Sequence, residues 1–129
     1  MNIFGIGTDI ISVERIKNSL KNKNFIKRIF NEKEVLKCRK IRSDIHCFAK
    51  RFAAKEAFSK ALGTGISNGV NFNEIVVLNK KSGKPYIELI GQTKKILNKK
   101  FKGKKSKISL SLSDEKKYAV AFVTISLWT

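Results

Sequence analysis

The chain has 129 residues, and its 28 lysines and arginines against 10 aspartates and glutamates give a formal net charge of +18 at pH 7. This length suits one domain with a single core, and we expect residues 1–129 to form it. A hydrophobic content of 42% argues against a disordered chain. No apolar run approaches the roughly 20 residues of a membrane helix, and the start lacks a signal-peptide pattern, so we expect a cytoplasmic protein.

The two cysteines, Cys38 and Cys47, fit no metal or redox spacing and are too few for a disulfide scaffold. They favour a reducing compartment, although the two can form one intramolecular bridge.

The positive charge indicates an anionic partner, such as nucleic acid, an acidic protein, a phosphorylated metabolite or anionic lipid. A merely solvated excess of lysine is the other interpretation, and it stays open because net charge says nothing specific about fold.

The first third of the chain predicts one strand and then short helices. Residues 2–7 are apolar with two glycines and predict a strand, and Ser12 is a suitable N-cap for a following helix. Residues 25–30 predict a second helical segment. Asn31 and Glu34 then have the spacing of a capping box, which opens a third helix.

The clearest helix covers residues 45–62, which are rich in alanine and free of glycine and proline. Asp44 can cap its start, and Gly63 stops it. After it the periodicity changes from helical to alternating. The expected elements are strands at 74–78 and 86–90 joined by a turn, a lysine-rich helix at 92–101, and strands at 107–113 and 118–127. The fold class is therefore α+β, with helices first and a mainly antiparallel sheet second.

With so many cations present, the few carboxylates are the informative residues. Asp9 follows the glycine-containing segment 5–8 at the expected entrance to a helix. Glycines let a backbone approach a ligand closely, and helix N-termini favour phosphate, but this segment is neither a Walker loop nor a dinucleotide fingerprint. From position alone, Asp9 is most simply a helix cap.

Glu56 lies in the middle of the clearest helix, and at about 100° per residue its wheel neighbours are Ala49, Phe52 and Ala53. A carboxylate buried on such a face needs a metal ion or a cation as partner. Lys60 follows four residues later, and the spacing alone favours a surface ion pair between the two.

Asp9, Glu56 and Lys60 together would suit phosphoryl-type transfer, in which carboxylates hold Mg²⁺ while a cation and backbone N–H groups bind phosphates. The residues alone only suggest this chemistry. His46, the single histidine, lacks the company of a zinc or catalytic site, so we expect a structural or surface role for it.

Several motifs in order resemble one family. The longest, FAKRFAAKEAFSKALGTGI at 48–66, closely resembles the signature of the bacterial holo-acyl-carrier-protein synthases, which are small phosphopantetheinyl transferases. GIGTDI at 5–10 resembles their other signature. GKP at 83–85 and SLSD at 111–114, followed by YA at 118–119, extend the match over nearly the whole chain. The resemblance implies the 4′-phosphopantetheinyl transferase fold, with a long central helix packed on a mainly antiparallel sheet.

The resemblance also implies an enzyme that transfers 4′-phosphopantetheine from coenzyme A to a serine of apo-acyl carrier protein, for fatty acid biosynthesis, and releases adenosine 3′,5′-bisphosphate. Asp9 and Glu56 match the family's Mg²⁺ ligands, and Lys60 matches a residue that steadies the phosphate oxygens. Gly63 and Thr64 match positions near the coenzyme.

Two further segments match the family's binding surfaces. Members of this size are homotrimers with active sites between subunits, which implies a homotrimer here. The matching nucleotide loop, which meets the coenzyme from a neighbouring subunit, consists of Ser82, Gly83, Lys84 and Pro85. The segment that docks the acidic carrier protein is matched by Arg15, Phe25 and Arg28, so electrostatic steering is expected.

The sequence departs from the family at two places. Ser82 stands where the family often has asparagine, and Asp114 stands where some members have histidine. With no histidine there, the serine proton would pass to a metal-bound or ordered water, or to Asp9 itself.

A small basic nucleic-acid-binding module is the alternative function, although the sequence lacks a recognition motif or an aromatic stacking platform. A degenerate transferase kept for scaffolding is a third interpretation, and the presence of both carboxylates speaks against it.

Overall fold

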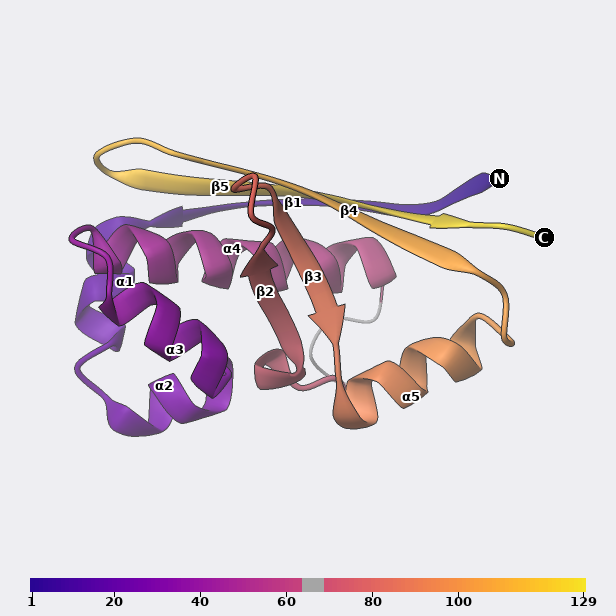
Figure 1. The fold of residues 1–129 in the computed structure, drawn as a ribbon, viewed down its shortest axis with the longest axis horizontal. Helices are drawn as coiled ribbons and strands as arrows, with labels where there is room; N and C mark the ends of the chain where they lie inside the picture. The colour runs from indigo at the N-terminus through magenta and orange to yellow at the C-terminus, as the bar shows by residue number, and fades with distance from the viewer. Residues whose placement is uncertain (64–68) are drawn as a thin grey trace.

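A long helix, α4, lies under a three-stranded sheet, and a β-hairpin and the remaining helices pack around its other sides (Figure 1). This architecture is seen in a computed structural model that describes residues 1–63 and 69–129. In chain order the elements are β1 (Asn2–Ser12), α1 (Val13–Ser19), α2 (Lys23–Ile29), α3 (Glu32–Arg39), α4 (Asp44–Leu62), the 3-10 turn η1 (Phe72–Glu74), β2 (Ile75–Asn79), β3 (Pro85–Leu89), α5 (Gly91–Lys100), β4 (Ser106–Asp114) and β5 (Tyr118–Leu127). Within these described residues, no helix is long and apolar enough to cross a membrane.

Both sheets are antiparallel, as the alternating sequence pattern predicts. The larger has the order β1-β5-β4, so the last strand lies between the first strand and its own hairpin partner. The smaller sheet is the β2–β3 hairpin, in which Val77 lies opposite Ile87. The α+β class and the long central helix are confirmed.

The first strand is longer than the sequence indicated. It runs to Ser12 rather than to Gly7, because pairing with β5 continues through the β-branched residues Ile10 and Ile11. Asp9 therefore lies inside β1, opposite Ala121, and its interpretation as a helix cap is wrong. Ser12 is the N-cap of α1, as predicted, and accepts a hydrogen bond from the backbone N–H of Arg15.

Two glycines of β1 allow α4 to lie directly on the strand. A Cβ on Gly5 would collide with the carbonyl oxygen of Ala61, and one on Gly7 would collide with that of Ala57. We expected these glycines to let the backbone approach a ligand. On the face of β1 that packs against α4 this expectation is wrong, because the helix occupies that space. They bring a helix close to a strand.

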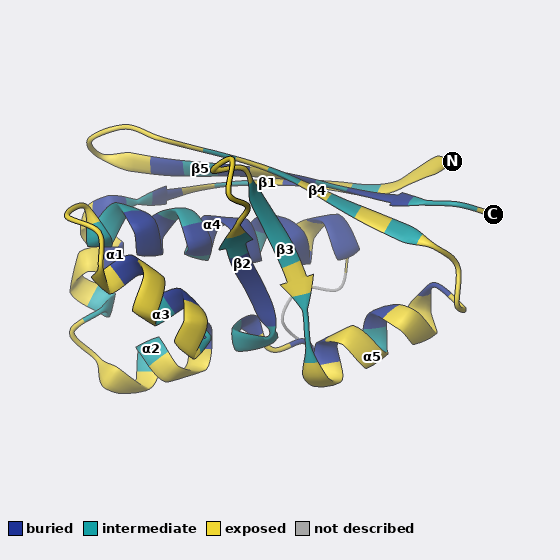
Figure 2. Ribbon diagram, viewed as in Figure 1, coloured by how far each residue is buried: buried dark blue, intermediate teal, exposed yellow. Residues whose placement is uncertain are grey.

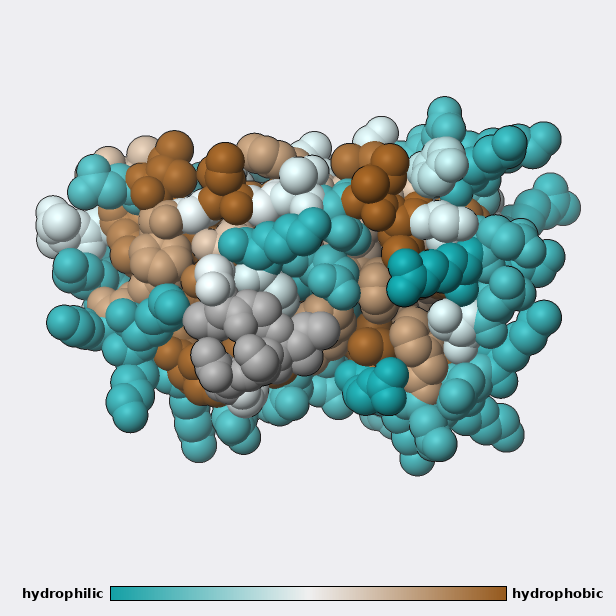
Figure 3. Space-filling view, turned by 180° about the vertical axis from the view of Figure 1, so that it is seen from behind, coloured by the Kyte–Doolittle hydropathy of each residue, from teal (hydrophilic) through white to brown (hydrophobic). Residues whose placement is uncertain are grey.

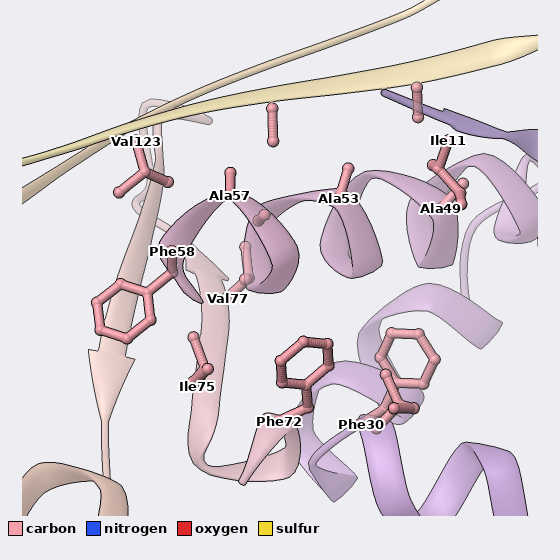
Figure 4. Packing of buried hydrophobic residues seen from close by; sticks show 14 of the residues in the cluster. Ile11, Phe30, Ala49, Ala53, Ala57, Phe58, Phe72, Ile75, Val77 and Val123 are labelled. Atoms are coloured by element: carbon pink, nitrogen blue, oxygen red, sulfur yellow. The ribbon is translucent and has the colours of Figure 1, made fainter. Parts of the chain in front are cut away.

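The core lies on both sides of α4 (Figure 4). Ala49, Ala53 and Ala57 are fully buried toward the sheet, where small side chains permit close packing. Larger side chains such as Phe58 and Ile75 fill the space on the opposite side of the helix. Figure 2 shows the resulting contrast between the buried α4 and the exposed outer faces of α2, α3 and α5.

The ends of the helices follow their sequence signals closely. The capping box of Asn31 and Glu34 is present, and Gly63 ends α4 in the left-handed conformation with φ of 85°. The N-cap of α4 is Ser43 rather than Asp44, which becomes the first helical residue. Cys38 of α3 and Cys47 of α4 form a disulfide, the outcome that the sequence left open.

Candidate active site between β1 and α4

The first strand and the central helix bring Asp9, Glu56 and Lys60 together. Gly5 lies against Ala61 and Gly7 against Ala57, so two strand residues advance by about the same length as four helix residues. The same step places Asp9 level with Ala53, one helical turn from Glu56. Residues almost half the chain apart thus meet because two regular elements run side by side.

Lys60 connects the helix to the strand. Its Nζ donates a hydrogen bond to the backbone carbonyl of Thr8 at 3.0 Å and lies 3.4 Å from Oδ1 of Asp9. The expected surface pair between Glu56 and Lys60 is therefore replaced by a pair across two elements. Among the described residues, the other ion pairs are Lys50–Asp114 and Lys55–Glu34.

Both carboxyl groups are half-buried, and the pKa of each lies above its ordinary value. Burial raises the pKa of Asp9 above its ordinary value, although Lys60 and Arg15 oppose this. Burial also raises the pKa of Glu56, and the negative charge of Asp9 raises it further. The two acids are thus close enough to repel each other, so a bound cation would stabilise the ionised pair.

Glu56 also lines a cavity of about 700 Å³ between α2, α4 and η1. Phe25, Phe52 and Phe72 give it apolar walls, and Arg28 adds a positive charge. The cavity is large enough for part of a cofactor and combines apolar surface with a few polar groups, as ligand sites usually do.

The predicted carrier-docking residues lie beside this region. Phe25 and Arg28 line the same cavity as Glu56, and Arg15 exerts a Coulombic effect on both Asp9 and Glu56. Gly63 follows directly after α4, one turn beyond Lys60. Thr64, the other predicted coenzyme residue, lies outside the described residues.

The predicted nucleotide loop is placed elsewhere. It forms the turn between β2 and β3, where the backbone N–H of Lys84 is 3.4 Å from the hydroxyl of Ser82 and Pro85 begins β3. Gly83 lines a second cavity of about 510 Å³, separate from the cavity of Glu56. One chain therefore does not bring all its predicted coenzyme residues to one place.

The second cavity is strongly basic. Its lining contains the cationic side chains Lys37, Lys50, Arg51, Lys80 and Lys81. Asp114, the residue at the family's histidine position, also lines it and lies 3.6 Å from Lys50. His46 lines it too, with its Nε2 3.2 Å from the carbonyl oxygen of Lys116.

The buried ion pair of Lys55 and Glu34 is not among the contacts that the sequence predicts. Both side chains have no exposed surface, and Lys55 Nζ lies 2.7 Å from Oε1 of Glu34. The capping box identified Glu34 but gave it only a local role. No sequence signal links it to Lys55, because 21 positions separate the two.

Comparison with known proteins identifies the class to which this chain belongs. The sequence model of the 4′-phosphopantetheinyl transferase superfamily matches residues 5–123. The chain belongs to that superfamily. Within it, the chain is an enzyme of the holo-[acyl-carrier-protein] synthase type.

Individual relatives match over nearly the full chain. A holo-[acyl-carrier-protein] synthase from Pelagibacter ubique is 51% identical over 125 residues, which cover 97% of this chain and 98% of that one. Among solved structures, the synthase from Neisseria meningitidis gives a TM-score of 0.84 at 39% identity and covers 96% and 98% of the two chains. The synthase from Bacillus anthracis, solved in complex with CoA (3′,5′-ADP), gives a TM-score of 0.80 at 35% identity, and the match covers 100% of both chains.

Proposed function

We propose that this chain, as a single domain over residues 1–129, transfers 4′-phosphopantetheine from coenzyme A to a serine of apo-acyl carrier protein. The products are holo-acyl carrier protein and adenosine 3′,5′-bisphosphate, and the reaction is Mg²⁺-dependent and serves cytoplasmic fatty acid biosynthesis. The observation that carries the proposal is the meeting of Asp9, Glu56 and Lys60 between β1 and α4. Family membership favours this enzyme over a nucleic-acid-binding module.

The donor set of the site fits Mg²⁺. Asp9 and Glu56 supply hard carboxylate oxygens, and each has a pKa raised by burial, with Asp9 adding repulsion at Glu56. Mg²⁺ is typically bound through one or two carboxylates together with substrate phosphates, rather than in an all-protein cage. When bound, the ion would neutralise charge on the pyrophosphate of coenzyme A.

The protein's own residues would then position the substrates. Lys60 would steady the phosphate oxygens, and its exposed ammonium is well placed to do so. The hydroxyl of the carrier's serine would attack the β-phosphorus, and the bond to the adenosine 3′,5′-bisphosphate leaving group would break. The serine proton would pass to Asp9 or to a water molecule.

The basic second cavity supports the predicted nucleotide role of the loop from Ser82 to Pro85. Five lysine and arginine side chains line the space beside Gly83, and such a concentration of charge attracts phosphate groups. We assign this cavity to the nucleotide end of coenzyme A. Because it is separate from the cavity of Glu56, a complete site would combine the two cavities from neighbouring copies.

An exposed apolar face supports a homotrimer. Ile6 and Ile10 of β1 and Tyr118 and Phe122 of β5 point away from α4, with exposed fractions of 61, 63, 44 and 45%. Figure 3 shows hydrophobic side chains gathered along the side of the molecule where the sheet lies, in contrast to the hydrophilic surface around α5. The side chains of this face are uncharged, so it offers a highly cationic chain a surface where further copies can pack.

The transfer is tested with the purified chain, coenzyme A, Mg²⁺ and apo-acyl carrier protein. Mass spectrometry should show the carrier gaining one phosphopantetheine group. Glu56→Ala should remove this gain while the fold is kept, whereas Glu88→Ala, at an exposed carboxylate of β3, should leave it intact. An unmodified carrier with the wild-type chain would reject the proposal, and full turnover by Glu56→Ala would reject the metal assignment.

The trimer is tested by light scattering after size-exclusion chromatography. The wild-type chain should have three times its monomer mass, and Ile6→Lys combined with Phe122→Lys should give a folded monomer. Leu36→Lys is the control, since Leu36 is exposed to 63%, close to the 61% of Ile6, but lies on α3. A monomeric wild-type chain would contradict the assembly.

A further inference from the structure

Lys55 is a buried lysine whose hydrogen-bonding capacity is fully used. Its ammonium nitrogen donates to Oε1 of Glu34 at 2.7 Å, to the carbonyl of Phe72 at 2.8 Å and to the carbonyl of Ile75. A lysine ammonium carries three N–H bonds, so each hydrogen has one acceptor.

The acceptors of Lys55 lie on elements that form the site. Phe72 begins η1 and Ile75 begins β2, so the lysine holds both ends of this turn. All three residues of η1 line the 700 Å³ cavity that also contains Glu56. Lys55 therefore joins the helix that carries Glu56 to another wall of the same cavity.

Glu34 completes the connection from the other side. Its Oε1 also accepts from the backbone N–H of Asn31, and its Oε2 accepts from that of Val77. The buried pair thus fixes α3, α4, η1 and β2 relative to one another through four hydrogen bonds, and the bond from Asn31 closes the capping box within α3.

Stability alone does not account for such a pair. Removing two charges from water is costly, and apolar residues of similar volume often stabilise a protein as well or better. A three-way ammonium contact gives something that apolar packing lacks, namely one fixed distance between the turn and the helix.

We propose that Lys55 is a positioning residue that sets the place of the η1 wall relative to Glu56 and thereby the fit of coenzyme A. This inference rests on the proposed function, since it concerns the same cavity. Lys55 does not contact the reacting atoms. It acts through the wall, so its loss should weaken substrate binding more than it slows the chemical step.

The test compares steady-state kinetics of variants that remain folded. Glu34→Gln combined with Lys55→Met removes both charges of the pair, and it should raise KM for coenzyme A about tenfold while changing kcat less than about twofold. Lys55→Arg keeps the charge but cannot direct three N–H bonds from one nitrogen, so it should also raise KM. Val123→Ala, at a fully buried position on β5, is the control for general destabilisation.

An unchanged KM in both Lys55 variants, or an equal rise in Val123→Ala at matched unfolding free energy, would overturn the inference. A second readout is independent of activity: hydrogen exchange at the backbone amides of 72–77 should be faster in the double variant than in wild type. Unchanged exchange there would also overturn the inference. A wild-type chain without transferase activity would instead count against the proposed function, which separates the two failures.

Discussion

Lys60 and Asp9 form an ion pair across 51 positions of sequence, with Nζ and Oδ1 3.4 Å apart. The two partners differ in exposure, because 57% of the Lys60 side chain is accessible and only 16% of the Asp9 side chain is. The cation thus lies at the mouth of the site and the acid lies further in. An anionic substrate would meet the lysine first.

Neutralising Glu56 should stabilise the metal-free protein. The raised pKa means that the folded chain holds the Glu56 proton more tightly than the unfolded chain does, so stability falls as pH rises through the carboxylate range. Glu56→Gln should therefore be more stable than wild type at pH 7 without divalent ions, and the difference should vanish below about pH 4. Urea unfolding of both proteins at pH 7 and below about pH 4 measures this difference in unfolding free energy.

Mg²⁺ should reverse the order of stability, so that wild type becomes more stable than Glu56→Gln. A ligand that binds only the folded state raises the free energy of unfolding, and the wild-type site keeps both carboxylates. Adding Mg²⁺ at pH 7 should raise the midpoint of wild-type unfolding and leave that of Glu56→Gln nearly unchanged. Equal stabilisation of both would mean that the ion binds elsewhere.

Gly7→Ala should damage both fold and activity. The new Cβ would meet the carbonyl oxygen of Ala57, which is backbone and cannot move without displacing α4. We expect a loss of about 3 kcal/mol in unfolding free energy and a large fall in transfer, because the helix that carries Glu56 must shift. Ser111→Ala, on the exposed face of β4, should change neither by much. A fully active and stable Gly7→Ala chain would show that the helix and strand are not in close contact.

Local signals predicted most of the fold. The capping box, the glycine stop after α4 and the alternating pattern of β4 each act within a few residues, so sequence spacing was sufficient to place them. The end of β1 was misplaced because it depends on pairing with β5, more than 100 positions away. The resemblance identified Asp9 and Glu56, but spacing alone favoured a cap and a surface pair for them.

Long-range contacts account for what was missed. Lys55 looks like one more surface lysine in a chain that has many, and only the meeting of α3, α4 and η1 makes it a buried partner of Glu34. The role of Gly7 was misinterpreted for the same reason, since nothing local shows that a helix will pass over it.

Reduction should weaken the link between α3 and α4. The bridge from Cys38 to Cys47 closes a loop with a sequence separation of 9, which the chain-entropy relation equates with about 2–3 kcal/mol. Dithiothreitol should lower the unfolding free energy by that amount, and Cys38→Ser should match the reduced wild type. No change on reduction would show that the bridge does not form in solution.

Glu74 should stabilise α5 in a pH-dependent way. Partial burial raises the pKa of its carboxyl, but hydrogen bonds from Asn71, Thr93 and Gln92 outweigh this and hold the pKa below its ordinary value. Its stabilisation is therefore present above about pH 4.5 and is lost as pH falls through the lowered folded pKa.

Glu74→Gln should then cost about 1 kcal/mol at pH 7, comparable with the loss of a helix cap, and much less near pH 2. Thermal unfolding across this pH range measures the difference between the two proteins. Glu88→Gln is the control, because Glu88 is exposed on β3. A constant difference at all pH values would contradict the ionised capping role.

Direct contact between the main chains of β1 and α4 limits how closely the helix can approach the strand. At Gly5 and Gly7 no side chain lies between the strand and the helix, so backbone atoms alone set the separation of the two elements there. Substitutions that change the size of the surrounding phenylalanines would alter the packing of the core but not the separation between β1 and α4. We therefore expect Asp9 and Glu56, which these two elements carry, to keep their separation when substitutions change the rest of the hydrophobic core.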